Sequence, residues 1–319
     1  MNMSRAVDGA ELLVPYELRP DRSARYFARI VGKWLLRLAI FVLAIMALHL
    51  LITSDTIEWH VVAQYLTAPA ILQGVITTLV LTAIAMIIGI LLGGLLALMR
   101  LSNSLLLNGV TSLYLWFFRG TPLLAQILFW YNLASFIKRI SIGIPFGPSF
   151  ISWNTNDLIS PLTAAILALG LNQAAYMCEI VRAGILGVDE GQLEASAALG
   201  MTSSRAFRRI VLPQAMRIII PPTSNNAIGL LKDSSLVSVI SMTELLYAVQ
   251  QVYSRTFQTI PLLIVASIWY LMMTTVTSIG QYYIERHYGR GTRRDQRLSA
   301  VARITVMFRK NLLSVVKVG

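Results

Sequence analysis

Residues 75–99 read VITTLVLTAIAMIIGILLGGLLALM and contain no charged side chain. A helix needs about 20 mostly apolar residues to cross the hydrocarbon core of a bilayer, and this stretch exceeds that length. It is the clearest apolar run in the chain. It therefore predicts a membrane-spanning helix.

The rest of the chain is almost as apolar. Of the 319 residues, 56% are hydrophobic and 13% are charged, whereas an ordinary globular domain is about 25% charged. The mean hydropathy is +0.66. This composition excludes a soluble protein and a disordered one, and it predicts an all-α polytopic membrane protein. Five further stretches are predicted to span the membrane, namely 34–52, 111–136, 162–185, 218–239 and 259–284.

The distribution of positive charge orients these six helices. The net charge is +12, and Lys and Arg gather in residues 1–33, 186–217 and 285–319, whereas the 53–70 loop has none. Because basic loops stay on the cytoplasmic side, both termini are expected there. In a membrane protein these loops explain the basic charge better than nucleic-acid binding does.

Four parts of the chain are distinguished on this basis. We expect a basic cytoplasmic segment, a first spanning helix with its outer loop, the main transmembrane domain and a basic cytoplasmic tail. The tail either lies on the inner leaflet as an amphipathic helix or is loose. The corresponding residues are 1–33, 34–66, 67–287 and 288–319.

Small residues recur at every fourth position of the 75–99 stretch, at Ala85, Gly89, Gly93 and Ala97. This spacing makes a shallow groove along one face of a helix and lets a neighbouring backbone approach closely. It predicts a packing seam in a helical bundle.

Charged residues inside the predicted spans are costly unless they face protein or water. Arg119 falls in the third span and either faces such an interior or extends its side chain to the cytoplasmic interface. Glu179 and Arg182 are three residues apart on one helix face. They are expected to pair, either as a structural contact or in contact with a transported solute.

The 218–239 stretch is the most polar of the six. It holds two adjacent prolines, Pro221 and Pro222, and the polar residues Asn225, Asn226, Lys232 and Asp233. Broken or polar segments at membrane depth occur where they are buried in protein or line water, and transporters bind solutes at such segments. The alternative is that part of this stretch is cytoplasmic and only 234–246 lies deep.

The 186–217 loop has the signals of two short helices. Asp189 and Gln192 have the spacing of a capping box for a helix that ends near Gly200. Thr202 is placed to cap a second helix that runs to Pro213. A DNA-binding helix-turn-helix is excluded because both ends are tethered to spans. The pair suits a groove on another protein.

This loop resembles the EAA loop of ABC importer permeases, whose pattern is E-A-A, three residues, G, nine residues, I-x-L-P. Here it reads Glu194-Ala195-Ser196, Gly200 and then IVLP at 210–213, with Ser in place of the third Ala. Further stretches are similar to the polar-amino-acid permeases, over about 72–289. They are RGTPLL (119–124), AY (175–176), EIVRAG (179–184), GQ (191–192), LPQA (212–215) and KDSSL (232–236).

The resemblance implies a type I ABC importer transmembrane domain with one extra N-terminal helix. It implies two ABC ATPase subunits, a second permease copy or homologue, and an extracellular amino-acid-binding protein. No G-x-x-x-x-G-K-[ST] is present, so ATP and Mg are expected on the partners and no cofactor on this chain. Transport would proceed by alternating access in a prokaryotic inner membrane.

The resemblance also assigns roles to residues. No catalytic or metal-binding residue is expected, because no nucleophile–base pair or Cys/His cluster stands out. The expected ATPase-coupling residues are Gly191, Gln192, Glu194, Ala195, Ser196, Gly200, Ile210, Leu212 and Pro213. The candidates for the substrate pathway are Arg119, Gln126, Gln173, Glu179, Asn225, Asn226 and Lys232.

Three alternatives stay open at this point. The solute could be another amino-acid-like molecule of the opine or cystine type. An intramembrane enzyme would have to use Glu179 or His49, and no paired catalytic carboxylates or H-E-x-x-H motif supports it. A passive channel would leave the EAA-like loop unexplained.

Overall fold

The chain divides into two compact units, residues 1–61 and 62–319. The computed structural model describes residues 22–54, 57–144 and 147–288. The first unit holds α1 (Arg22–Thr53), which contains the predicted 34–52 stretch. The predictions for most of the basic N-terminal segment and for nearly all of the C-terminal tail lie outside the described residues.

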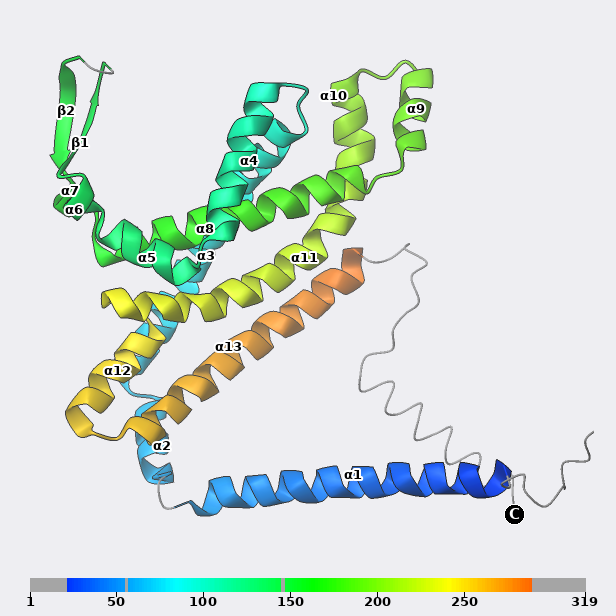
Figure 1. Cartoon of the computed structure of the whole chain (residues 1–319), viewed down its shortest axis with the longest axis vertical. Helices are drawn as coiled ribbons and strands as arrows, with labels where there is room; N and C mark the ends of the chain where they lie inside the picture. Colours follow the sequence, from blue (N-terminus) through cyan, green and yellow to red (C-terminus); the bar gives the residue numbers. More distant parts are fainter. Residues whose placement is uncertain (1–21, 55–56, 145–146, 289–319) are drawn as a thin grey trace, which may run out of the picture. The chain divides into compact units, whose positions relative to one another are not determined.

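Three helices of the described chain are long and apolar enough to cross a membrane, and they are α3, α8 and α13. They confirm the helices predicted at 75–99, 162–185 and 259–284. Figure 1 shows the elements, which after α1 are α2 (Trp59–Leu66), α3 (Pro69–Arg100), α4 (Leu105–Gly120), α5 (Leu123–Tyr131), α6 (Leu133–Phe136), β1 (Arg139–Gly143), β2 (Ser149–Asn154), α7 (Thr155–Leu158), α8 (Pro161–Leu186), α9 (Glu190–Ala198), α10 (Ser203–Ala206), the π-helical η2 (Phe207–Val211), α11 (Leu212–Asp233), the 3-10 helix η3 (Ser234–Ile240), α12 (Leu245–Thr256) and α13 (Thr259–Tyr288).

The predicted seam on α3 is where α3 packs against α8. Ala85 and Ala97 are fully buried. A Cβ atom added to Gly89 would lie 2.5 Å from the Cγ of Gln173 on α8. One added to Gly93 would lie 2.5 Å from the Cβ of Met177. The two backbones approach this closely because the seam carries no larger side chains.

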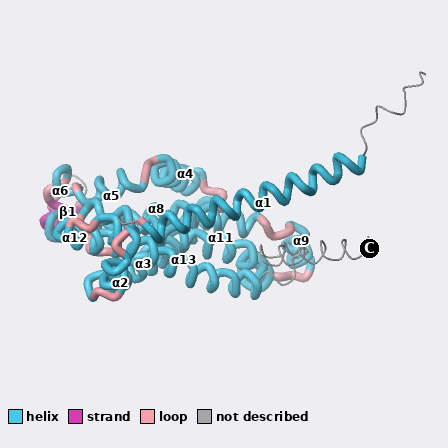
Figure 2. Tube along the Cα trace, turned by 90° about the horizontal axis from the view of Figure 1, so that it is seen from below, coloured by secondary structure: helices cyan, strands magenta, loops and turns pink. Residues whose placement is uncertain are grey.

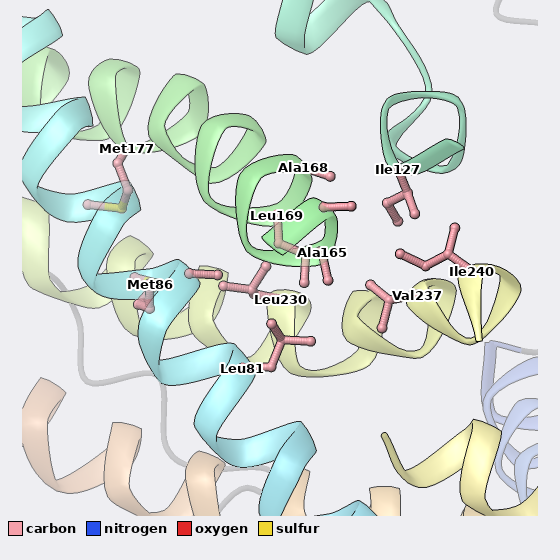
Figure 3. Packing of buried hydrophobic residues seen from close by; sticks show 12 residues of the cluster. Leu81, Met86, Ile127, Ala165, Ala168, Leu169, Met177, Leu230, Val237 and Ile240 are labelled. Carbon is pink, nitrogen blue, oxygen red and sulfur yellow. The ribbon is translucent and has the colours of Figure 1, made fainter. Parts of the chain in front are cut away.

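One apolar cluster packs α3 and α8 against α5, α11 and η3 (Figure 3). Leu81 and Met86 of α3 meet Leu169 of α8, with Leu230 of α11 beside them. Ile127 brings α5 into the same cluster. Val237 and Ile240 add η3 to it. This cluster therefore holds α11 and η3 against α3 and α8.

The third predicted span is not one helix. The chain is extended at Thr121 and Pro122, which separates α4 from α5. The residue before a proline is disfavoured in the helical region, and the break leaves backbone carbonyls without helical partners. The buried amide of Gln126 donates to the carbonyls of Phe118 (3.0 Å) and Thr121 (3.1 Å). Asn172 of α8 also donates to Phe118, at 2.9 Å. The predicted 111–136 span is therefore two helices, α4 and α5, and the chain changes direction at Pro122, where a bend or a helix start was expected.

The fifth predicted span begins earlier and is less broken than expected. Helix α11 starts at Leu212 and runs through both prolines to Asp233, where the 3-10 turn of η3 takes over. A proline at position i leaves the carbonyl at i−4 without its helical donor, which here frees the carbonyls of Arg217 and Ile218. The hydroxyls of Thr223 and Ser224 donate to the next two carbonyls, those of Ile219 and Ile220, at 2.8 Å and 3.0 Å. The expected interruption at the prolines is therefore wrong.

A two-stranded antiparallel hairpin follows α6, and the sequence analysis did not foresee it. Strands β1 and β2 pair Ile140 with Trp153 and Ile142 with Ile151. The hairpin and α9 lie at opposite ends of α8, as both views show (Figures 1 and 2). Helix α8, which separates these two elements, is long and apolar enough to cross a membrane.

A fully buried carboxylate fixes the start of α12. Glu244 is 0% exposed, and it accepts hydrogen bonds from the backbone N–H groups of Leu246 (2.9 Å) and Tyr247 (2.8 Å). The hydroxyl of Tyr270 on α13 donates to it at 2.7 Å. Thr78 of α3 accepts from the Leu245 N–H at 3.1 Å. This polar cluster ties α3, α12 and α13 together.

Candidate functional site

Helix α9 is a capped and almost wholly exposed helix. Its residue Ser196 is buried, and the other eight are exposed. The carboxylate of Asp189 accepts from the Gly191 N–H at 2.8 Å, as predicted for the start of this helix. No hydrogen bond returns from the side chain of Gln192, so the reciprocal half of the predicted capping box is absent from the described contacts. A nine-residue helix held by so few buried groups is available to pack against another surface.

The helix ends at Gly200 in a Schellman motif. The Gly200 N–H donates to Ala197 (2.9 Å), and the Met201 N–H donates to Ser196 (3.0 Å). Gly200 has φ +70°, in the left-handed region that favours glycine. The predicted stop is confirmed. Ser196, which replaces the usual alanine, donates its hydroxyl to the Leu193 carbonyl at 2.7 Å and needs no further partner.

The second short helix does not end at Pro213 as expected. Thr202 precedes α10 without a side-chain cap, and the chain stays helical through η2 into α11. Proline has no N–H to donate, and the π-helical turn lies directly before Pro213, where a regular hydrogen bond would be lost.

Within the IVLP segment, Val211 is the buried residue. Val211 packs with Val188, Ala215 and Ile219 at the end of α8. Ile210 is half-buried, and Leu212 and Pro213 are exposed. The sequence pattern thus located the segment, although it did not show which side chain fixes it to α8.

One face of α11 is polar and open. Pro222, Asn225 and Lys232 are exposed and recur at helical spacing. A Cβ added to Gly229, which lies between Asn225 and Lys232 on this face, would meet nothing within 4 Å. In the described part of the chain, the side chains of Asn225 and Lys232 make no hydrogen bond or salt bridge. The face from Pro222 to Lys232 is called the open α11 face below.

Glu179 lies at the centre of an arginine cluster. The predicted pair with Arg182 is confirmed at 3.3 Å. Two contacts were not foreseen, with Arg100 at 2.6 Å and Arg119 at 3.8 Å. Arg119 also lies over the ring of Tyr176, 5.8 Å from its centroid. Arg119 is therefore paired, although almost half of its side chain stays exposed.

The remaining predicted site residues are packed rather than open. Gln126 is 3% exposed and bound to the α4–α5 break, as described above. Gln173 is 4% exposed, and its amide contacts the sulfur of Met86 at 3.5 Å. Asn226 is half-buried, and its Nδ2 is buried without a hydrogen-bond acceptor. The seven pathway candidates thus lie in several places rather than in one cavity.

A family model described as "Binding-protein-dependent transport system inner membrane component" matches residues 89–290. This range includes the capped helix α9, the IVLP segment, the arginine cluster and the open α11 face. The chain belongs to this family.

Two relatives of this transport component are named as permease proteins of transport systems. The arginine transport system permease protein ArgU of Corynebacterium glutamicum is 42% identical, over 90% of this chain and 89% of that protein. The L-cystine transport system permease protein TcyB of Bacillus subtilis is 36% identical, over 74% and 94%. A crystal structure of an amino acid ABC transporter with histidines has a chain that is 35% identical, with TM-score 0.61, over 74% of this chain and 99% of that one.

The N-terminal extension of this transport component is shared. The match to ArgU takes in 90% of the chain, which is more than residues 67–319 can supply. Part of residues 1–66 therefore has a counterpart in that relative, whereas the TcyB match is confined to 74% of the chain.

Contacts between distant residues of this transport component were missed by sequence reasoning. Arg100 lies 79 residues from Glu179, and Asn172 lies 46 residues from its partner Gln126. Glu244 lies in a stretch without a strong signal. The residue types alone gave no sign of these pairs, because arginine at the end of an apolar helix is commonly an interface residue.

Proposed function

We propose that this transport component is the membrane-spanning subunit of an ATP-driven importer of amino acids. Helix α9 carries the proposal: it is a well-capped helix that buries one residue, so it is built to be covered by another protein. We assign it to the docking of an ABC ATPase. Of the expected coupling residues, Gly191, Gln192, Glu194 and Ala195 are exposed and can contact that partner.

The proposed complex has two ATPase subunits, a second permease copy or homologue, and a soluble amino-acid-binding protein outside. ATP and Mg belong to the ATPase subunits, and this chain binds no cofactor. The names of the relatives favour a small amino acid or an amino-acid derivative as the solute. ATP binding closes the ATPase pair, α9 moves with it, and the spans alternate between inward-open and outward-open states.

The open α11 face is the best-supported part of the pathway. Residues 218–233 of α11 follow the proposed cytoplasmic loop, and at 1.5 Å per residue they cover about 24 Å of the roughly 30 Å apolar core of a bilayer. A lipid-facing asparagine and lysine would be costly there. Asn225 and Lys232 therefore face water or the second permease copy, and they suit the carboxylate of an amino acid. Asn226 lies beside them, and we assign Gln126 and Gln173 a packing role.

Reconstitution tests this function. The chain would be co-purified with its partner subunits, placed in liposomes with the binding protein, and assayed for uptake of acidic, neutral and basic amino acids. Uptake should require ATP on the ATPase side. Uptake that persists without any ATPase subunit would identify a channel instead, and chemical conversion of the solute would identify an enzyme.

Replacing Lys232 by glutamine should change solute preference without changing assembly. Hydrogen bonds to charged groups are worth about 1.5–3 kcal/mol, so affinity for solutes whose carboxylate meets Lys232 should fall roughly tenfold or more. The relative uptake of acidic, neutral and basic amino acids measures this. Lys138→Gln, in the loop before β1, is the matched control and should behave as wild type. If preference and affinity are unchanged in both variants, the solute binds elsewhere.

The proposed orientation has its own test. The 53–70 and 136–160 loops should be outside the cell, and residues 1–33, 186–217 and 285–319 inside. In a Cys178→Ser background, His60→Cys should react with an impermeant thiol reagent on intact cells, whereas Arg205→Cys should react after lysis. The reverse pattern would invert the topology.

A further inference from the structure

A pocket of about 450 Å³ lies where α3, α4 and α8 meet. Arg100 lines it from the end of α3, Ser112 and Arg119 from α4, and Tyr176 and Glu179 from α8. The proposed function assigns no ligand to this pocket. Its charges are unbalanced, because more arginines than carboxylates line it.

Three guanidinium groups surround one carboxylate. Glu179 binds Arg100 and Arg182 closely, and Arg119 is the most distant of the three at 3.8 Å. The cluster therefore keeps two uncompensated positive charges. In addition, the Nε of Arg182 is buried and has no hydrogen-bond acceptor. No other carboxylate of the described chain forms a salt bridge with these arginines.

The position of the pocket makes this excess costly unless an anion compensates it. Arg100 is the last residue of α3, and Glu179 lies within the last two turns of α8. In the orientation proposed above, both helix ends lie at the inner leaflet. Basic pockets between transmembrane helices on that side bind anionic lipid headgroups. The cytoplasmic leaflet carries such lipids, so the counter-charge is available there.

The rim of the pocket distinguishes a lipid from a soluble anion. Trp116, which lines the pocket, is 73% exposed. Its ring can contact the acyl chains of a lipid whose headgroup is held by the arginines. A soluble phosphate would leave this ring without a partner.

We propose that this pocket binds the phosphate headgroup of an anionic phospholipid of the inner leaflet. Arg119 and Ser112 supply exposed donors for phosphate oxygens, and Tyr176 keeps the guanidinium of Arg119 beside the pocket. Arg119 then contacts lipid rather than the transported solute, and Glu179 holds the arginines in place. The inference depends on the proposed orientation and is independent of which solute is carried.

Native mass spectrometry of the purified, detergent-solubilised complex tests the proposal. Phosphatidylglycerol and phosphatidylcholine with identical acyl chains are titrated separately, and inorganic phosphate is added as a competitor. We expect phosphatidylglycerol to bind preferentially. Arg119→Gln should weaken its binding roughly fivefold, the factor that corresponds to about 1 kcal/mol per basic residue near an anionic surface. Arg286→Gln, at an exposed arginine near the end of α13, is the matched control.

A second variant is expected to change lipid binding in the opposite direction, which excludes misfolding as the explanation. Glu179→Gln removes the negative charge of the cluster and should strengthen phosphatidylglycerol binding, which a damaged pocket would not do. Equal binding of the two lipids, or no loss in Arg119→Gln relative to Arg286→Gln, would overturn the proposal. Complete displacement by millimolar inorganic phosphate would show that the site takes a soluble anion instead. None of these results depends on amino-acid uptake.

Discussion

Gly93→Val is expected to remove most of the folded subunit from the membrane, whereas Gly94→Val is expected to have little effect. A Cβ at Gly93 would lie 2.7 Å from the carbonyl oxygen of Ala174 and 2.9 Å from the backbone nitrogen of Cys178. Overpacking a core costs about 1–3 kcal/mol and occasionally more. Here the obstructing atoms are backbone, so the cost should lie at the upper end or beyond.

Gly94, the next residue, is the matched control for Gly93. A Cβ at Gly94 would meet nothing within 4 Å, so the valine there adds the same intrinsic helix propensity without a clash. Membrane abundance and the thermal unfolding of purified protein should be measured for both variants. Equal abundance and equal Tm would contradict the close packing of α3 on α8.

Gly200→Val should abolish most ATP-dependent uptake while the subunit stays in the membrane. The left-handed conformation costs a non-glycine residue roughly 1–2 kcal/mol, and a β-branched side chain tolerates it poorly. This strain is enough to shift the turn after α9 by about tenfold against its native form. The ATPase should then dock poorly or hydrolyse ATP without transport. Uptake, ATPase activity and co-purification of the ATPase subunit measure the three effects.

Gly200→Asn separates backbone conformation from side-chain bulk. Asparagine adopts the left-handed region more readily than other side chains, and a Cβ at this position would meet nothing within 4 Å. The asparagine variant should therefore keep most of its uptake. If valine and asparagine behave alike, the positive φ of Gly200 is irrelevant to coupling.

Local signals in the sequence located three of the six predicted spanning helices, α3, α8 and α13, because length and hydropathy are properties of a continuous stretch. The spacing of Ala85, Gly89, Gly93 and Ala97 likewise predicted the seam. Close packing of two helices depends on small residues at the contact, and these are visible in the sequence. The capped helix ending at Gly200 was predictable for the same reason. Each of these features is determined by residues within a few turns.

Features that depend on distant partners were predicted less well. The prolines at 221 and 222 suggested a broken helix, yet α11 continues through both of them to Asp233. Thr121 and Pro122 do end α4, and the carbonyls of Phe118 and Thr121 accept hydrogen bonds from Gln126 and, at Phe118, also from Asn172. Neither outcome can be read from proline alone. The role of Glu179 similarly depends on Arg100, which is adjacent only after α3 packs on α8.

The unbroken helical path from α10 through η2 and α11 to η3 has a mechanical consequence. It runs from Ser203 to Ile240 without a loop, so a tilt imposed at its first turn reaches the open α11 face as rigid-body motion. A flexible joint would dissipate such a tilt as local bending. The π-helical turn at Phe207–Val211 lies within this path and changes its hydrogen-bond register without breaking the helical backbone.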